Sequence, residues 1–263
     1  MTGSSRRCVR GYESAVDDRA RRIHTASQVD FRPKTTFSLR NRRFDHWTPQ
    51  YLRYRIQAAI RAILHPEEPS LTPVAIRDLE RLLRPDSVGV EWGSGNTTRF
   101  FARRTKHLVS YETDPSYYER ISGTLRAEHL TNVDYRLIPH DFEGEDNEQE
   151  MHRNPLVRAV DLFEDESLDY ALIDSAPRGC LSRGIAPKIK HGGVLVLDNA
   201  NWFLPPPGNV RPPAPGSVAA TFGTPGSAVA HHECWPAFAR ETAGWNARWS
   251  SNGIQMTLIL IKP

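Results

Sequence analysis

The chain has 263 residues, of which 39% are hydrophobic and 25% charged, which is the balance of a soluble globular domain. No apolar run approaches the ~20 residues that span a bilayer, and no apolar segment follows the basic start, so we expect no membrane span and no secretory signal. The three cysteines, Cys8, Cys180 and Cys234, are few and widely spaced. They predict no disulfide framework and a reducing, cytoplasmic location.

The net charge of +3 is unevenly distributed. Residues 1–61 carry 13 Arg and one Lys against five acids, a net charge of +9, so the rest of the chain carries −6. A basic segment can bind an anionic partner such as nucleic acid, although a solvated N-terminus has the same composition. Because residues 1–45 lack sustained hydrophobic periodicity, we expect them to form a basic, flexible N-terminal arm.

Two helices are predicted between residues 46 and 86. The apolar spacing over 51–64 is helical, and a second helical pattern runs from Pro73 to Leu83. Proline suits the first turn of a helix, because its missing N–H has no partner there. We interpret residues 46–86 as an N-terminal helical cap.

Strand and helix patterns alternate over the middle of the chain. Strands are expected at 87–92, 107–112, 133–139, 168–174 and 193–198, and helices at 96–104, 115–130, 154–163 and 181–190. This alternation predicts an α/β fold with a doubly wound, mostly parallel sheet and helices on both of its faces.

The C-terminal part departs from this alternation. Residues 203–230 are rich in Pro and Gly and predict a long loop. A last helix is expected over 233–245, and 253–262 has the pattern of a final strand. We expect a seven-stranded sheet and treat residues 87–263 as one domain.

A glycine turn follows the first strand of this domain. Glu91 precedes Gly93, Ser94 and Gly95, and the second strand ends in Glu112. Such a βαβ unit usually holds a nucleotide-like cofactor. The glycines let the backbone approach the ligand, and the second acid accepts hydrogen bonds from ribose hydroxyls.

The charge beside this turn separates two classes of cofactor. Thr98 stands where a strict dinucleotide fingerprint has its third glycine, and the carboxylate of Glu91 would repel a pyrophosphate. S-adenosylmethionine has an ammonium and a sulfonium and no phosphate, so the sign of the charge favours it over NAD. An NAD(P)-dependent oxidoreductase stays open as an alternative.

Several motifs taken together resemble the class I S-adenosylmethionine-dependent methyltransferases, which have a Rossmann-like fold. They are Val90-Glu91-Trp92-Gly93-Ser94-Gly95, Tyr111-Glu112, Asp169-Tyr170-Ala171-Leu172-Ile173-Asp174 and Gly192-Gly193-Val194-Leu195-Val196-Leu197-Asp198-Asn199. The resemblance covers about residues 87–200. It implies that Glu91 and the glycine turn line the methionine half of the cofactor and that Glu112 holds the ribose. It also places Asp141 and Phe142 at the adenine, and it implies an antiparallel final strand.

Methyl transfer to an O–H or N–H group needs an aligned acceptor and a group that takes its proton. Two residues that follow predicted strands are candidates for this base. Asp174 ends the fourth strand, and His140, which titrates near neutral pH, follows the third.

Part of the sequence also resembles the cation-dependent O-methyltransferases. That resemblance implies Asp174, Asp198 and Asn199 as oxygen ligands of Mg²⁺. Pro177 stands where that family has a lysine, and Arg178 beside it is a poor base because it stays protonated. A turn that only ends the strand is the alternative role for Asp198 and Asn199.

The sequence thus predicts a transferase that methylates a hydroxyl or carboxyl group of a small molecule. Methylation of RNA or protein through the basic arm is the alternative. Against a base-modifying enzyme, the fourth strand is followed by Asp174-Ser175-Ala176-Pro177 rather than by an Asn-Pro-Pro-Tyr motif. A homo-oligomer formed through the N-terminal helix or the final strand stays open.

Overall fold

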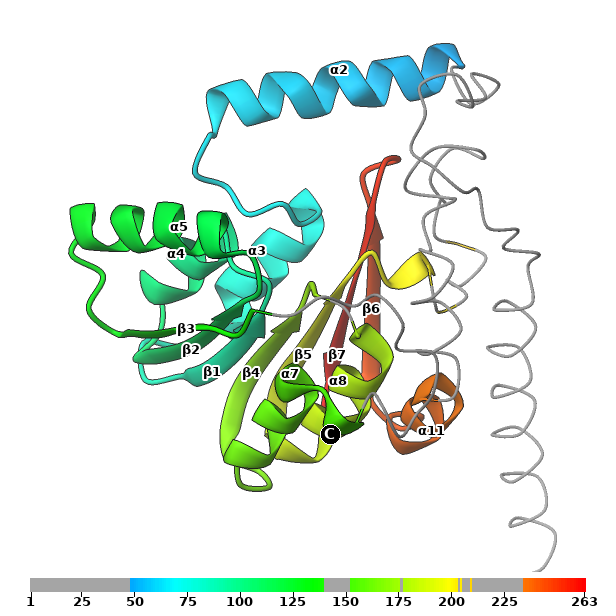
Figure 1. Ribbon diagram of the computed structural model, residues 1–263. Helices are drawn as coiled ribbons and strands as arrows, with labels where there is room; N and C mark the ends of the chain where they lie inside the picture. The colour runs from blue at the N-terminus through cyan, green and yellow to red at the C-terminus, as the bar shows by residue number, and fades with distance from the viewer. Residues whose placement is uncertain (1–47, 140–151, 176, 203, 205–208, 210–233) are drawn as a thin grey trace, which may run out of the picture.

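The computed structural model describes residues 48–139, 152–175, 177–202, 204, 209 and 234–263. Four groups of sequence predictions lie wholly or mostly outside these residues: the basic arm 1–45, His140, the adenine pair Asp141 and Phe142, and most of the loop 203–230. The described residues form one seven-stranded sheet with helices on both faces (Figure 1).

The strand order across the sheet is β3-β2-β1-β4-β5-β7-β6. The strands are β1 (Val88–Trp92), β2 (His107–Glu112), β3 (Val133–Leu137), β4 (Leu168–Ile173), β5 (Ile189–Asp198), β6 (Asn246–Ser251) and β7 (Met256–Ile261). The first five pair in parallel, and β7 lies antiparallel between β5 and β6. The mostly parallel sheet and its antiparallel final strand are therefore confirmed.

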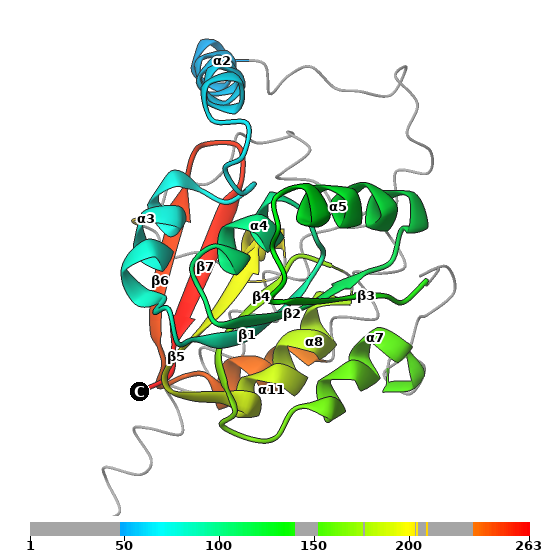
Figure 2. The ribbon, with the colours of Figure 1, turned by 90° about the vertical axis from the view of Figure 1, so that its left-hand side faces the viewer.

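Helices cover the two faces of the sheet as separate groups (Figure 2). One group comprises α3 (Pro73–Leu82), α4 (Asn96–Ala102) and α5 (Pro115–Ala127), and the other α7 (Pro155–Arg158), α8 (Arg178–Ile185) and α11 (Cys234–Glu241). Short 3-10 turns follow at η2 (Ala159–Leu162), η3 (Ala186–Lys188) and η4 (Ala200–Trp202). The remaining helix, α2 (Pro49–Leu64), lies beyond the first group in the view of Figure 2.

Four of these helices begin with the same local signal. A side chain that can accept a hydrogen bond is followed at once by proline in Thr48-Pro49, Thr72-Pro73, Asp114-Pro115 and Asn154-Pro155. Each cap accepts a backbone N–H of the first turn, and proline lacks the N–H that would otherwise need a partner. These starts depend on neighbouring residues only, which is why the sequence locates them well.

The core has two parts, one on each face of the sheet. On the face of α7 and α8, the fully buried Trp92 stacks on Tyr111 with ring centroids 5.4 Å apart. On the other face, Phe101 stacks on Tyr170 at 4.6 Å. Since β1 carries Trp92 at its end, its core packing fixes the direction in which the chain enters the glycine turn.

Two details of the C-terminal part differ from expectation. The strand β6 was not predicted, because Asn246–Ser251 is largely polar and its first three residues are exposed, as suits the edge of a sheet. The helix expected over 233–245 ends at Glu241, which leaves room for this strand. None of the described helices combines the length and the apolar character that crossing a membrane requires.

The cysteines correct another expectation. Cys180 on α8 and Cys234 on α11 form a disulfide with Cα atoms 5.3 Å apart, and both residues are buried. The sequence predicted no disulfide framework, and it missed this disulfide because 54 residues separate the two cysteines in sequence, whereas the packing of α8 against α11 brings them together. The cysteine content therefore gives no support for a reducing compartment.

This disulfide leads to a direct prediction. An unreduced digest of the protein should contain a peptide that links Cys180 to Cys234, and neither residue should react with an alkylating agent before reduction, even in the unfolded protein. Peptide mapping by mass spectrometry, with and without reductant, checks this, and Cys8 provides the internal comparison. Quantitative alkylation of Cys180 in the unfolded, unreduced protein would contradict it.

Candidate active site

The predicted site residues within the described part of the chain lie at the carboxyl ends of the parallel strands. They are Glu91, Gly93, Ser94, Gly95, Glu112, Asp174, Asp198 and Asn199. Their strands are neighbours, because β1 pairs with β2 on one side and with β4 on the other, and β4 pairs with β5. Parallel strands end together here, where open α/β sheets bind their ligands.

Gly93 makes the turn possible. Its φ is +96°, and a Cβ at this position would lie 2.9 Å from the backbone oxygen of Asp174. The amide of Gly93 donates to Tyr111, and the amide of Asp174 donates to Trp92. Only glycine fits this crossing of three strand ends, which keeps the backbone of the turn tightly placed over the sheet.

Glu91 lies directly beneath this turn and is fully buried. Its Oε1 accepts hydrogen bonds from the hydroxyls of Thr98 and of Ser110, the latter at 2.7 Å. Its Oε2 is buried and has no hydrogen-bond partner among the described residues. Burial raises the pKa of Glu91 to about 7, against the lowering effect of these two hydroxyls and of the nearby hydroxyl of Thr97.

Thr98 has a role that the glycine pattern did not reveal. The amide of Gly95 donates to its hydroxyl at 2.9 Å, and that hydroxyl donates in turn to Glu91. The residue that replaces the third glycine of a dinucleotide fingerprint therefore caps α4 and holds the buried carboxylate. Its position three residues after Gly95, typical of a capping box, is the signal that could have identified it.

Glu112 receives hydrogen bonds on both of its oxygens. Oε1 accepts the amides of Thr113 and Asp114 at 2.8 and 3.0 Å, and Oε2 accepts the amide and the hydroxyl of Ser94. The hydroxyl of Ser94 also lies 2.7 Å from the hydroxyl of Tyr135, a residue of β3. These contacts fix the side chain of Glu112 at the end of β2, next to the glycine turn.

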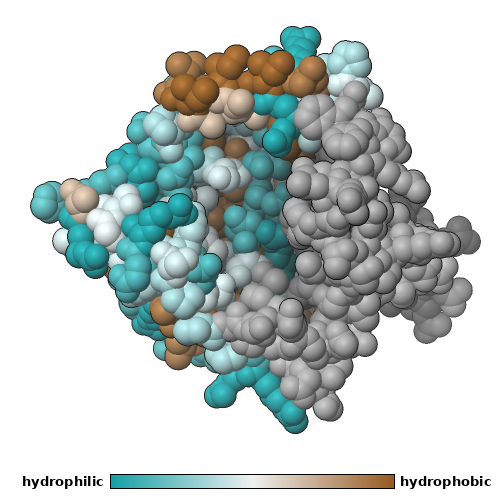
Figure 3. Space-filling model, turned by 45° about the horizontal axis from the view of Figure 1, so that its top comes forward, coloured by the Kyte–Doolittle hydropathy of each residue, from teal (hydrophilic) through white to brown (hydrophobic). Residues whose placement is uncertain are grey.

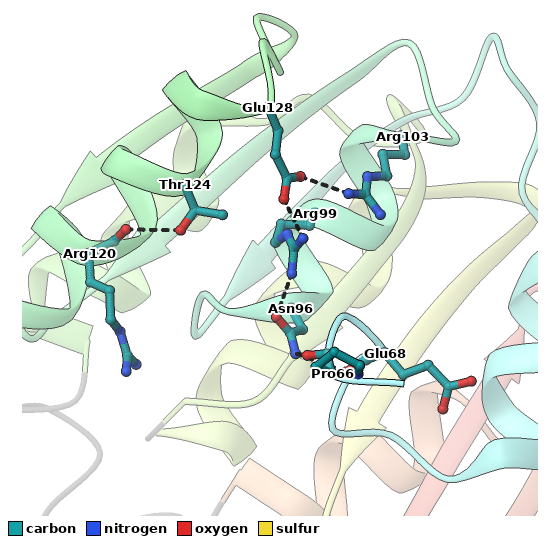
Figure 4. Close-up of polar contacts among 8 residues, drawn as sticks. All are labelled: Pro66, Glu68, Asn96, Arg99, Arg103, Arg120, Thr124 and Glu128. Carbon is teal, nitrogen blue, oxygen red and sulfur yellow. Dashed lines mark hydrogen bonds and ion pairs between the residues drawn. The ribbon is translucent and has the colours of Figure 1, made fainter. Parts of the chain in front are cut away.

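Asn96, the first residue of α4, connects this turn to the segment that follows α2. Its side-chain amide donates to the carbonyls of Pro66 and Glu68 at 2.8 and 3.0 Å. Its side-chain oxygen accepts from Arg99, and Arg99 also pairs with Glu128 at the end of α5 (Figure 4). The chain after α2 is therefore held against the start of α4.

Asp174 and Arg178 form an ion pair at the end of β4. The guanidinium of Arg178, at the start of α8, donates to Oδ1 of Asp174 at 2.5 Å. The surrounding protein raises the pKa of Asp174, although 32% of its side chain is exposed, and the charge of Arg178 opposes this rise. In the sequence Arg178 stood out only as a poor base, and its pairing with Asp174 was not predicted.

Asp198, at the end of β5, is almost completely buried. Its Oδ1 accepts the hydroxyl of Thr257 at 3.1 Å, and its Oδ2 accepts the side-chain amide of Asn199 at 2.6 Å. Burial raises its pKa, nearby Asp174 adds to the rise, and Arg178 lowers it. Asn199 has a φ of +51°, so the chain turns sharply after the strand.

These residues do not fit the Mg²⁺ site that the partial resemblance implied. The permanently charged Arg178 occupies one oxygen of Asp174 and also acts electrostatically on Asp198. The side chain of Asn199 turns its amide nitrogen toward Asp198, to which it donates a hydrogen bond. A metal ligand would instead direct its oxygen toward the ion. Within the described residues, no cluster of three or more His, Cys, Asp and Glu is placed to hold a metal ion.

No family model and no curated protein sequence matches the chain. Solved structures do match it in fold. A methyltransferase from Geobacter sulfurreducens is 12% identical, covers 80% of this chain and 89% of its own, and has a TM-score of 0.45. A Streptococcus mutans protein described as a candidate methyltransferase, in complex with SAH, is 11% identical, with coverage of 72% and 96% and a TM-score of 0.46.

Other matches are shorter. The YcgJ protein of Bacillus subtilis is 16% identical with a TM-score of 0.35, and the match spans 48% of each chain. For a protein from Galdieria sulphuraria the chain spans 44% of that protein's length. The TM-scores of these matches lie below 0.5 and the identities at or below 16%, so the matches report a partial likeness of fold only.

Proposed function

We propose that this protein is an S-adenosylmethionine-dependent methyltransferase that acts on a hydroxyl or carboxyl group of a small molecule. The observation that carries the proposal is the buried carboxyl of Glu91 with its unpartnered Oε2 beneath the glycine turn. In its ionised form this buried carboxylate repels a phosphate and gains from a cationic ligand group, which would lower its raised pKa. This supports a cofactor with an ammonium and a sulfonium over a dinucleotide.

Three parts of the site would hold the cofactor. Glu91 would face its ammonium, the turn at Gly93 and Gly95 would contact its methionine half, and Glu112 would accept hydrogen bonds from its ribose. Bound there, S-adenosylmethionine would supply an electrophilic methyl group on a cationic sulfur. Asp141 and Phe142 stay predicted adenine contacts.

Ribose binding has a consequence for Ser94. Because both oxygens of Glu112 already accept two donors each, a ribose hydroxyl would replace the hydroxyl of Ser94 at Oε2. That hydroxyl would keep Tyr135 as a partner, 2.7 Å away. Glu112 would lose the hydrogen bond from the hydroxyl of Ser94 and gain one from the ribose hydroxyl in its place.

We propose Asp174 as the base that takes the proton of the methyl acceptor. Its Oδ1 is held by Arg178, which orients the carboxylate and would leave Oδ2 to accept the proton of an acceptor hydroxyl. Burial and the arginine act on the pKa of Asp174 in opposite directions. His140 stays an alternative base outside the described residues.

Residues 46–86 would form a cap beside this site. The contacts of Asn96 with Pro66 and Glu68 hold the segment between α2 and α3 against the first turn of α4. That turn directly follows the proposed cofactor loop. We propose residues 87–263 as the methyltransferase domain and this cap as part of the wall that shields the acceptor from water.

Calorimetry with S-adenosylhomocysteine, NAD⁺ and NADP⁺ tests the proposal on the full chain. We expect S-adenosylhomocysteine to bind, and we expect no binding of NAD⁺ or NADP⁺. Tight binding of NAD⁺ or NADP⁺ alone would overturn it. Transfer of labelled methyl from S-adenosylmethionine to phenols, carboxylic acids or RNA then identifies the acceptor class, and a steep salt dependence of acceptor binding would indicate nucleic acid.

A further inference from the structure

The helix α2 exposes its large apolar side chains on the face that points away from the molecule. These side chains form the α2 apolar face, which comprises Leu52, Ile56, Ile60, Ile63 and Leu64, with exposed fractions between 44% for Leu52 and 78% for Ile63. Figure 3 shows a brown band running along this helix. A surface helix normally buries such a stripe against the core, so this orientation is inverted.

The opposite face of α2 contacts the protein near the N-terminal end of the helix. Tyr51 is 6% exposed. The ring of Tyr54 lies directly against the backbone of Gly253, so close that a Cβ added to this glycine would be 2.4 Å from the ring. Gly253 lies in the turn between β6 and β7, so α2 rests on that hairpin. The helix cannot roll to bury its apolar side chains on its own body without losing these contacts.

The C-terminal end of α2 is fixed as well. The guanidinium of Arg61 donates two hydrogen bonds, at 2.6 and 2.8 Å, to the carboxylate of Glu68. The carbonyl of Glu68 accepts from Asn96 at the start of α4. The contacts of Tyr54 and of the segment after Arg61 therefore hold α2 at two places along its length, although most of its side chains are exposed.

We infer that this face is a dimer interface, occupied by α2 of a second copy of the chain in antiparallel orientation across a two-fold axis. Its residues recur at intervals of three and four along the helix, which is the spacing of helices that pack together. Antiparallel pairing also sets the two helix dipoles in opposite directions, which favours association.

The charges beside the face fit this orientation. In the sequence of α2 all charged residues are basic, and Glu67 and Glu68 follow its end. Antiparallel pairing brings the N-terminal half of one α2, which carries Arg53, toward the segment with Glu67 that follows α2 in the other copy. A parallel pair would instead place arginine beside arginine.

The exposed area suits a dimer of moderate stability. Five half-exposed aliphatic side chains present roughly 300–400 Å² of apolar surface per copy. With the flanking polar residues of both copies the buried total approaches about 1,000 Å², the lower limit for a specific interface. The dimer should therefore dissociate on dilution, and it does not depend on the proposed function.

Light scattering of the full chain at several concentrations tests the inference. The wild-type protein should approach twice its 29.8 kDa monomer mass at high concentration. Ile60→Glu should raise the dissociation constant on the order of a hundredfold, with an unchanged circular dichroism spectrum because the residue is 51% exposed. Leu162→Glu is the matched control: Leu162 is 65% exposed, lies outside α2, and should leave the dimer intact.

Charge reversal tests the orientation. Arg53→Glu and Glu67→Arg should each weaken the dimer, and the double variant should recover it. A wild-type protein that stays monomeric overturns the inference. Binding of that monomer to phosphatidylserine vesicles would then indicate a membrane as the occupant, and dimerisation only after removal of residues 1–47 would indicate that this segment occupies the face.

Discussion

Replacing Glu91 by glutamine is expected to change the stability of the ligand-free protein in opposite directions at low and high pH. Burial raises the pKa of Glu91 from 4.5 to about 7. The folded state therefore keeps a proton that the unfolded chain releases at lower pH, so the wild type loses stability as pH rises through this window. Between about pH 5 and pH 8 the loss amounts to about 2–3 kcal/mol.

The Glu91→Gln variant should lack this pH dependence, because its amide does not titrate, while its oxygen can still accept from Thr98 and Ser110. Urea unfolding at both pH values measures the difference. The variant should also bind S-adenosylhomocysteine about ten- to a hundredfold more weakly, since a charged hydrogen bond is lost. Glu119→Gln, at an exposed position on α5, is the matched control; equal pH profiles for all three proteins would refute the assignment.

Replacing Arg178 by methionine is expected to cost about 3–5 kcal/mol of stability above neutral pH, because it removes the cation from two largely enclosed carboxyl groups. The guanidinium bonds to Asp174 and acts on Asp198. Without it both pKa values rise further, so the loss should grow as pH rises and shrink at acidic pH, where both groups are protonated. Chemical denaturation across pH measures this.

Arg183 provides the comparison on the same helix. Its ion pair with Glu241 spans 3.5 Å between side chains that are 37% and 45% exposed, so Arg183→Met should cost less than about 1 kcal/mol. Arg178→Lys should retain part of the lost stability because it keeps the charge. If Arg178→Met is no worse than Arg183→Met, the pair with Asp174 does not stabilise the fold.

The Arg178→Met variant also tests whether the protein depends on a metal ion. We expect wild-type methyl transfer to be unaffected by EDTA and the wild-type protein to bind no Mn²⁺ at this site. Arg178→Met, which leaves Asp174 and Asp198 without the competing cation, should gain Mn²⁺ affinity, detectable by electron paramagnetic resonance. If the wild type binds one equivalent of Mn²⁺ and Asp174→Asn loses this binding, the result would support the predicted magnesium site.

Much of the sheet was predictable because its signals are local. The strand ends at Glu91, Glu112 and Asp174 follow short apolar runs, and the glycine turn needs only its own backbone freedom. The helix starts depend on a cap and a proline that are adjacent in sequence. The polar edge strand β6 was missed because a half-exposed strand at a sheet edge has no clear alternation of apolar residues.

The partners of the site residues were less predictable. Thr98 interrupts a glycine motif in sequence, yet in the fold it holds Glu91. The cation beside Asp174 is a helix residue rather than a metal, which only the start of α8 at the end of β4 reveals. Thr257 contacts Asp198 because β7 pairs antiparallel with β5, in a register that places the two residues opposite each other.

The amino-acid sequence by itself determined the order of the elements, the glycine turn and the acidic strand ends, because each depends on residues within a few positions of one another. Only the tertiary structure decided which group faces each buried carboxylate, that Cys180 meets Cys234, and which side of α2 points outward. These depend on strand register and on helix packing between segments far apart in the chain, and no local pattern encodes that geometry.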